Sequence, residues 1–365
     1  MEVFKLIGFK EGIITKILEI NDDVSWVEVM IESNVCKAVN YNGLTGCPKT
    51  GDSVVLNTTA VDLSLGTGGY HFIIHNNRIK RNETSGKGHI MKLRYTPLQM
   101  KCLAAEEEDS LYHDSIKSFN NLNKSIYIVG TLHSMLAPIA AIIKWMAPKL
   151  KVNYIMTDAG ALPIHFSKTV KQLKEKKIIN NTITVGHAFG GDLECVNIYT
   201  GLIASDVVLN SDVTIITMGP GIVGTGTKYG FSGIEQGYII DAVNVLNGTS
   251  FAVPRVSFAD KRDRHKGISH HTITTMSEIT YSRSNLVLPY LEDSKMKIIT
   301  SQINEYGIDE KHNIIYEEGK DVKAAMDYFG LKVKTMGRDY YGDQEFFMTL
   351  GAVGRNTVNF LNNRR

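Results

Sequence analysis

The sequence has little net charge. Its 365 residues include 40 Lys+Arg and 38 Asp+Glu, which leaves a formal net charge of +2. A protein that binds nucleic acid or an anionic membrane through a broad electrostatic field carries a larger excess of basic residues. We therefore expect neither a nucleic acid nor a membrane as a partner.

Cysteine is also scarce. The four cysteines form no C-x-x-C pair, which disfavours a zinc knuckle and a thioredoxin-type redox centre. The N-terminal segment MEVFKLIGFKEG carries acids and has no long apolar stretch, unlike a secretory signal. No uncharged apolar run reaches the roughly 18 residues needed to span a bilayer. These absences predict a cytoplasmic protein with reduced thiols.

Two catalytic signatures are missing as well. The sequence contains neither a Gly-Lys-Ser/Thr phosphate loop nor an H-E-x-x-H zinc motif. It does contain 43% hydrophobic and 21% charged residues, which is typical of a globular protein. The length is suited to about two domains. The classes of protein that remain are a globular enzyme and a globular binding protein.

The first part of the chain has the pattern of a small β domain. Short runs rich in Ile, Val and aromatic residues cover Gly12–Ile20, Val24–Glu32 and Val35–Tyr41, and polar turn residues separate them. Many short strands with polar turns predict an all-β barrel or sandwich over residues 1–82. Residues 83–124 then form a connecting segment, in which we expect a helix that exposes Glu106, Glu107 and Glu108 to solvent.

Residues 125–365 alternate between apolar β-type runs and helical patterns. This alternation predicts a Rossmann-like α/β domain, with a doubly wound and mostly parallel sheet covered on both faces. The expected strands are Ile126–Gly130, Val152–Thr157, Thr182–Val185, Val213–Met218 and Phe251–Phe258.

Polar residues collect where these strands end. Ligands of open parallel sheets bind beyond the carboxyl ends of the strands. His133, Asp158, His187 and Asp192 follow the first three strands, and imidazole and carboxylate groups there are candidates for acid–base catalysis or metal ligation. The alternative is that the two histidines bond loop backbone while the two aspartates cap helices.

The loop after the fourth strand is rich in glycine. Gly219, Gly221 and Gly224 fit the spacing G-x-G-x-x-G, and Thr225 and Thr227 add hydroxyl groups. Glycines at this place allow backbone amides to approach an anion, so we predict that the loop binds one. A purely structural turn is the main alternative. A nicotinamide dinucleotide site is disfavoured because that fingerprint normally follows the first strand of its unit.

The densest polar cluster follows the fifth expected strand. We predict that it binds an anion opposite the glycine-rich loop, because arginine donates paired hydrogen bonds to phosphate or carboxylate. Adjacent histidines need not share one metal ion, and a solvated basic turn is the alternative. The residues concerned are Asp260, Arg262, Arg264, His265, His270 and His271.

The chain resembles an uncharacterised bacterial family, catalogued as domain of unknown function 3866. The resemblance is carried by GHIMKLRYTP at Gly88–Pro97 and by the segments Met156–Pro163, Gly186–Asp192, Gly219–Thr227 and Ser257–Thr272. Ala159 stands where we expect the family pattern to have glycine. The resemblance implies no activity, catalytic residue or cofactor.

These observations favour an enzyme that acts on a small anionic metabolite or nucleotide, including a phosphorylated one, by hydrolysis or group transfer. A non-catalytic ligand-binding or regulatory protein and a structural assembly protein are the alternatives, since fold does not decide between them. No cofactor or metal is assigned, and assembly into a homo-oligomer is left open.

Overall fold

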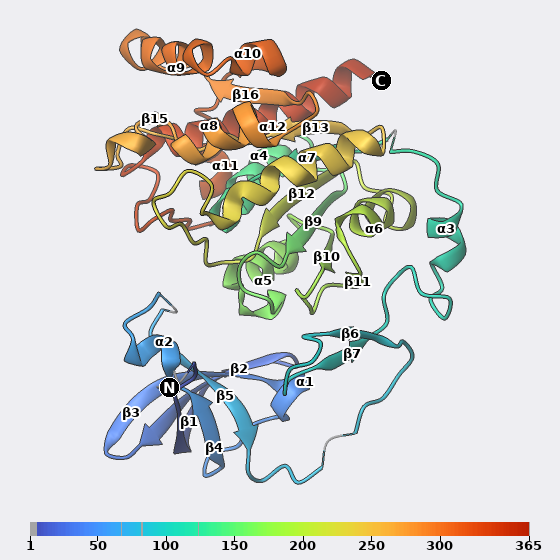
Figure 1. Cartoon of the computed structure of the whole chain (residues 1–365), viewed down its shortest axis with the longest axis vertical. Coiled ribbons are helices and arrows are strands. Elements are labelled where there is room, and N and C mark those ends of the chain that lie inside the picture. Colours follow the sequence, from blue (N-terminus) through green and yellow to red (C-terminus); the bar gives the residue numbers. More distant parts are fainter. Residues whose placement is uncertain (1–5, 67, 82, 123, 365) are drawn as a thin grey trace, which may run out of the picture. The chain divides into compact units, whose positions relative to one another are not determined.

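The computed structural model describes residues 6–66, 68–81, 83–122 and 124–364. The chain divides into two compact units. One contains residues 1–87 and 93–101, and the other contains residues 88–92 and 102–365. No helix within the described ranges is long and apolar enough to cross a membrane. Figure 1 shows the elements in chain order.

The first unit is a closed barrel of five strands in the order β1-β2-β3-β5-β4. Neighbouring strands are antiparallel except β3 and β5, and the pairing of β4 with β1 closes the barrel. A fourth strand that returns beside the first is a Greek-key connection, as in five-stranded OB-fold barrels. The strands are β1 (Phe9–Ile20), β2 (Val24–Ile31), β3 (Asn34–Tyr41), β4 (Ser53–Asn57) and β5 (Tyr70–Asn76).

The second unit contains an eight-stranded sheet in the order β11-β10-β9-β12-β8-β13-β16-β17. All its neighbouring strands are parallel. This confirms the prediction of a small β barrel followed by a doubly wound parallel sheet. The strands are β8 (Ile126–Val129), β9 (Val152–Thr157), β10 (Asn181–Val185), β11 (Leu193–Cys195), β12 (Val213–Met218), β13 (Thr249–Ala252), β16 (Asn285–Pro289) and β17 (Asn313–Glu317).

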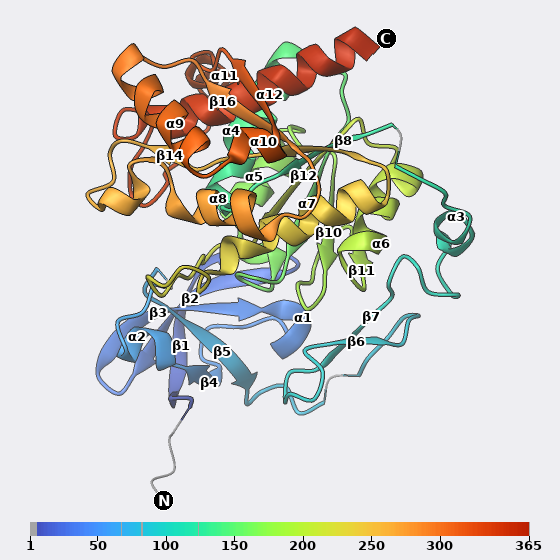
Figure 2. The same ribbon diagram turned by 45° about the horizontal axis from the view of Figure 1, so that its top comes forward.

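Helices cover both faces of this sheet (Figure 2). Side chains along a strand point to opposite faces in turn, so Ile126 and Ile128 of β8 join one core while Tyr127 and Val129 join the other. The first core lies under α4 (Leu136–Met146), α5 (Lys168–Glu175), α11 (Val322–Tyr328) and α12 (Gln344–Arg364). The second lies under α6 (Ile198–Ile203), α7 (Glu235–Val245), α8 (His270–Thr274), α9 (Asp293–Glu305) and α10 (Ile308–Lys311).

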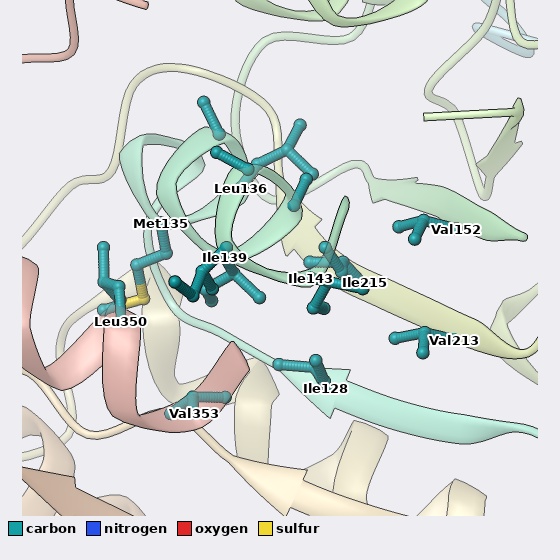
Figure 3. Packing of buried hydrophobic residues seen from close by; sticks show 14 of the residues in the cluster. Ile128, Met135, Leu136, Ile139, Ile143, Val152, Val213, Ile215, Leu350 and Val353 are labelled. Carbon is teal, nitrogen blue, oxygen red and sulfur yellow. The ribbon is translucent and has the colours of Figure 1, made fainter. Parts of the chain in front are cut away.

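The first core is tightly filled by aliphatic side chains. Figure 3 shows Ile139 and Ile143 of α4 packed between Ile215 of the sheet and Val353 of α12. Each of these four side chains is fully buried. Burying an aliphatic side chain of this size contributes about 1.5–3 kcal/mol, so this layer holds the strand ends in place.

Two details of the sequence prediction are wrong. The run Phe251–Phe258 is not one strand, because β13 ends at Ala252 and the separate β14 (Val256–Ser257) pairs antiparallel with β15 (Gly267–Ile268). Pro254 lies between them and has no N–H for a ladder bond. The expected acidic helix is also absent from the described residues around Glu107, whose buried carboxylate accepts a hydrogen bond from the Ala104 N–H instead.

Candidate functional site

The turns after β9 and β12 pack backbone against backbone. A Cβ atom on Gly160 would lie 2.4 Å from the carbonyl oxygen of Gly219, and one on Gly219 would lie 2.4 Å from that of Ala161. The Ala161 N–H donates to the Pro220 carbonyl oxygen at 2.8 Å. The close approach of the two backbones therefore requires glycine at Gly160 and Gly219. The neighbouring position tolerates the methyl side chain of Ala159.

The rest of the glycine-rich loop forms a hairpin. Gly224 pairs with Phe231, and the Thr225 N–H donates to the Gly230 carbonyl oxygen at 2.8 Å. The Thr225 and Thr227 hydroxyl groups bond each other, with 2.9 Å between their oxygens. This hairpin separates the last glycine of the G-x-G-x-x-G spacing from the start of α7, which a dinucleotide-binding turn would not do.

A cavity of about 290 Å³ opens at the carboxyl ends of β8 and β12. His133 and Ser134 line it from β8, and Gly221 lines it from the glycine-rich loop. Asp158 and His187 are not among its lining residues. The remaining lining residues come from the turn after β8, from α5, from the glycine-rich loop and from the segment before α12, and they are Leu132, Thr169, Pro220, Ile222, Lys332, Val333, Lys334, Thr335 and Met336.

Both ring nitrogens of His133 are engaged. Nε2 lies 2.6 Å from the Ser167 hydroxyl oxygen, and Nδ1 lies 3.2 Å from that of Tyr154. Burial lowers the pKa of His133 to about 4, so the imidazole is neutral at pH 7. His133 therefore forms a fixed polar wall of the cavity.

A pair of carboxyl groups lies beside the glycine-rich turn. The Asp158 carboxylate, at the end of β9, accepts a hydrogen bond from the His187 N–H at 2.8 Å. Glu235, the first residue of α7, accepts one from the Thr157 hydroxyl at 2.6 Å. Burial raises the pKa of Glu235 to about 7, against the Thr157 bond that lowers it, and the negative charge of Asp158 raises it further. Glu235 can therefore hold or release a proton near neutral pH.

The sequence analysis did not include Glu235. The signal was its position, since it is the first acid after the glycine-rich loop and opens the following helix. Its distinguishing property is a pKa raised by partial burial and by the charge of Asp158, which follows the distant strand β9, and no local pattern expresses that.

Asp192 lies away from the other candidates. Because β11 runs parallel to β10, the chain returns and places Asp192 beside Thr182, near the amino end of β10. The Asp192 carboxylate accepts bonds from the Thr182 N–H at 2.8 Å and from the Lys174 ammonium group. These contacts fix the loop, so we leave Asp192 out of the proposed site. His187 is half-buried and supports Asp158 through its main chain.

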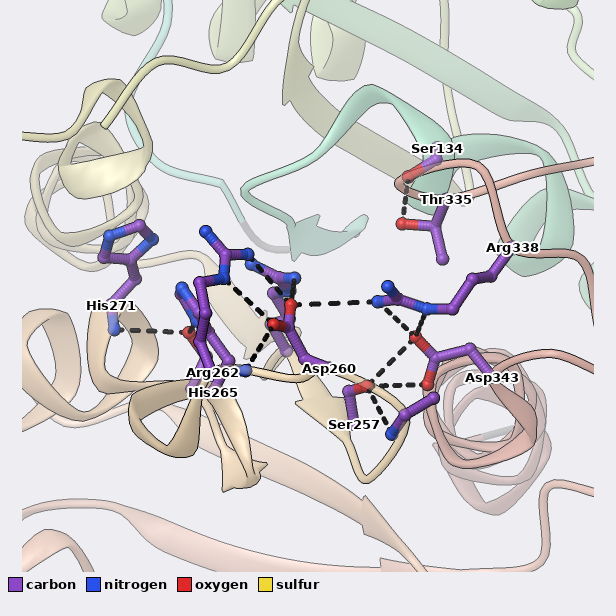
Figure 4. A network of polar contacts seen from close by, with 12 residues as sticks. Ser134, Ser257, Asp260, Arg262, His265, His271, Thr335, Arg338 and Asp343 are labelled. Atoms are coloured by element: carbon purple, nitrogen blue, oxygen red, sulfur yellow. Dashed lines mark hydrogen bonds and ion pairs between the residues drawn. The ribbon is translucent and has the colours of Figure 1, made fainter. Parts of the chain in front are cut away.

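The polar cluster after β13 is built around the carboxylates of Asp260 and Asp343, whose side chains are 5% and 1% exposed (Figure 4). Arg255 Nη2 lies 3.1 Å and Arg262 Nη2 lies 2.9 Å from Asp260 Oδ2. Arg338 lies 3.8 Å from the same oxygen and 2.9 Å from Asp343. Hydrogen bonds from Arg262 hold the pKa of Asp260 well below its usual range. The sequence analysis did not include Arg255, Arg338 or Asp343, which meet here only through the tertiary fold.

Three imidazole rings lie next to these arginines. Ring centroids are 4.1 Å apart for His270 and His271, 4.8 Å for His265 and His270, and 5.3 Å for His265 and His271. Phe231 of the glycine-rich hairpin stacks on His271, with 4.0 Å between centroids. Burial lowers the pKa of His265 to about 3 and that of His271 to about 4, with further lowering by the neighbouring positive charges.

This histidine cluster is not arranged as a metal centre. Among the described residues, no group of three or more His, Cys, Asp or Glu side chains is placed to hold a metal ion together. The three rings instead pack at tilted or edge-on angles to one another, and His271 stacks on Phe231.

A family model described as "Protein of unknown function (DUF3866)" matches residues 37–354. No curated protein matches the chain in sequence. A solved mutant of L. casei FPGS is 12% identical, with a TM-score of 0.30 over 69% of this chain and 61% of that one. A pantoate-beta-alanine ligase from Francisella tularensis is 12% identical, with a TM-score of 0.13 over 65% of this chain and 85% of that one. Neither likeness supports an argument about activity.

Proposed function

Because this chain belongs to the DUF3866 family, whose description assigns no activity, we propose its function from the site itself. The proposed function is an enzyme that hydrolyses or transfers a group of a small phosphorylated or otherwise anionic metabolite. Catalysis takes place at the carboxyl edge of the parallel sheet in the second unit.

The raised pKa of Glu235, to which the charge of Asp158 contributes, carries this proposal. A carboxyl group with a pKa of about 7 is suited to transfer a proton at neutral pH. A second carboxylate beside it is suited to orient a water molecule or a substrate hydroxyl group. In this proposal Glu235 is the general acid or base and Asp158 is its partner.

The cavity beside the glycine-rich turn supplies groups for binding an anion. Lys332 and Lys334 line it with exposed side chains, and Ser134, whose hydroxyl donates to Thr335, and Thr169 add hydroxyl groups. Gly221 has a positive φ of 104° and open space where a side chain would lie, so a ligand can approach its backbone closely. The cavity is therefore suited to hold a phosphate or a carboxylate.

One observation favours the alternative of ligand binding without turnover. The carboxyl pair does not line this cavity, and both nitrogens of His133, which does, are occupied by Ser167 and Tyr154. A regulatory protein would use the same cavity and keep its ligand unchanged. Product analysis distinguishes the two functions.

The test is an activity screen with nucleotides and sugar phosphates, followed by point variants. Glu235→Gln and Asp158→Asn should each lower kcat by about 10²–10⁴-fold, which is the usual contribution of a positioned acid or base. Lys332→Ala with Lys334→Ala should raise KM instead. Glu305→Gln, at an exposed position of α9, is the matched control. Full activity in both carboxyl variants, or retained ligand with no turnover, would contradict the enzyme proposal.

A further inference from the structure

Two nitrogen-bearing groups near the glycine-rich hairpin have no hydrogen-bond partner among the described residues. His270 Nε2 is a buried atom with no hydrogen-bond partner. The Arg264 guanidinium group is exposed and makes no hydrogen bond or ion pair with any residue in the described ranges. A Cβ atom on Gly226 would lie 3.9 Å from Arg264 Nη1, so this group and the hairpin are neighbours. A buried polar atom without a partner costs about 1–3 kcal/mol, which a bound anion would recover once Nε2 carries a proton to donate.

The surroundings of these donors favour an anion. Arg255, Arg262 and Arg338 contact the two carboxylates Asp260 and Asp343, and Arg264 adds a further positive charge. The positive charges of these arginines also act on His270. Burial is the largest cause that lowers the pKa of His270, and the charges of Arg264, Arg255 and Arg262 lower it further. An acceptor placed here would meet more positive than negative charge.

We propose that Arg264, His270 and the Gly224–Gly230 hairpin form a subsite for a tetrahedral dianion, and that binding of the dianion is coupled to protonation of His270. The subsite rests on the proposed function, in which it would receive a phosphoryl group of the substrate. Arg264 donates a pair of hydrogen bonds to two anion oxygens. His270 takes up one proton from water to become an imidazolium, and Nε2 then donates to a third oxygen.

The coupling follows from the charges that face His270. In the empty subsite the positive groups disfavour a charged imidazole, and a dianion reverses this balance. Affinity should therefore rise as pH falls. The titratable and charged groups around His270 are His265, His271, Arg255, Arg262 and Arg264, with Asp260 held between Arg255 and Arg262 and contacted by Arg338.

Sulfate is the appropriate probe, because it is a tetrahedral dianion that does not titrate between pH 5.5 and 8. Calorimetric titration of the full chain should show that sulfate binding strengthens as pH falls, by up to about tenfold per pH unit for one proton taken up. Buffers with different ionisation enthalpies should report uptake of that proton directly. Inorganic phosphate should compete with sulfate.

Three variants test the individual groups. Arg264→Ala should weaken sulfate binding by roughly 10–150-fold, the equivalent of one charge-assisted hydrogen bond, and Arg264→Lys should recover part of the loss. His270→Gln should remove the pH dependence. Lys261→Ala, which removes an exposed charge from the same loop, is the matched control and should bind sulfate like the wild type.

The outcomes separate this proposal from the proposed function. Equal sulfate affinity in Arg264→Ala and Lys261→Ala would overturn the subsite, as would an unchanged pH slope in His270→Gln. Glu235→Gln should bind sulfate normally. Intact sulfate binding in a protein without turnover would refute the enzyme and leave the subsite standing.

Discussion

Arg262 binds Asp260 through two parallel hydrogen bonds, from Nε to Oδ1 and from Nη2 to Oδ2, each 2.9 Å long. This two-point contact occupies the guanidinium N–H groups that the sequence analysis expected to bind a ligand. Arg264, two residues later, has no such partner in the described ranges. The two arginines therefore differ in function, with Arg262 holding the loop and Arg264 left for an anion.

We expect Asp260→Asn to destabilise the protein. The Asp260 side chain is 5% exposed, and loss of its charge leaves the buried Arg255 and the half-exposed Arg262 without this counter-charge. Breaking a buried ion pair such as Arg255–Asp260 from one side costs about 3–5 kcal/mol. Because the pKa of Asp260 is lowered, its contribution is present above the unfolded pKa and is lost as pH falls through the folded pKa. Urea unfolding at pH 7 measures the loss. Asp263→Asn in the same exposed loop is the control, and an equal effect in both variants would refute the prediction.

The Lys92–Glu194 pair should be equally important within the second unit. Lys92 Nζ is buried 2.6 Å from the Glu194 carboxylate and also donates to the carbonyl oxygens of Thr184 and Ala188. Lys92→Met should cost about 3–5 kcal/mol, because it leaves the carboxylate without its charge partner. Adding Glu194→Gln should recover part of this loss. Unfolding curves of both variants, with exposed Lys87→Met as control, test the pair, and no recovery in the double variant would argue against it.

Protonation of Glu235 should produce a distinctive pH dependence of stability. Its pKa rises from the usual 4.5 to about 7 on folding, so the folded state binds more protons between these values. The resulting contribution is fully present below pH 4.5 and is lost as pH rises through about 7. Glu235→Gln should remove this component, and the difference from wild type in urea unfolding should therefore change between pH 5 and pH 8. A constant difference across that range would show that the pKa is not raised.

Gly160 and Ala159 should respond differently to substitution. Gly160→Ala would place a Cβ atom 2.4 Å from the backbone oxygen of Gly219, where no flexible side chain can move aside. Overpacking of this kind costs about 1–3 kcal/mol. Ala159→Gly changes only the chain's conformational freedom and should cost about 1 kcal/mol or less. Thermal unfolding compares the two, and equal shifts in Tm would show that the approach of the two turns is not tight.

Much of the fold could be predicted from the sequence, because the information is local. Apolar runs such as Val152–Thr157 and Val213–Met218, separated by helical patterns, predict a parallel sheet covered on both faces, and the structure confirms it. Pro254 was a visible signal that the fifth run should break, since proline cannot donate to a ladder. The prediction overlooked it in favour of the apolar pattern.

The candidate site was harder to predict. His133 and Gly221 do line one cavity, but Asp192 was misplaced because the chain reverses after β10 and starts β11 beside it. The side chain of Glu235 was overlooked because its unusual proton affinity arises from partial burial and from Asp158, which follows β9 far back along the chain. The assignment of catalytic and ligand-binding roles stays a prediction until the variants are measured.

The sequence by itself determined the order of strands and helices and the places where glycine and polar residues follow a strand. These properties depend on the period of apolar residues and on backbone preferences, which act over a few positions. Only the tertiary structure decided which of those polar residues meet. Asp260 is contacted by Arg338 from a segment far along the chain, and the half-buried Glu235 feels the charge of Asp158, because strand order and helix packing bring them together. Charge interactions and desolvation depend on distance in space, so the chemistry of this site is a property of the folded chain.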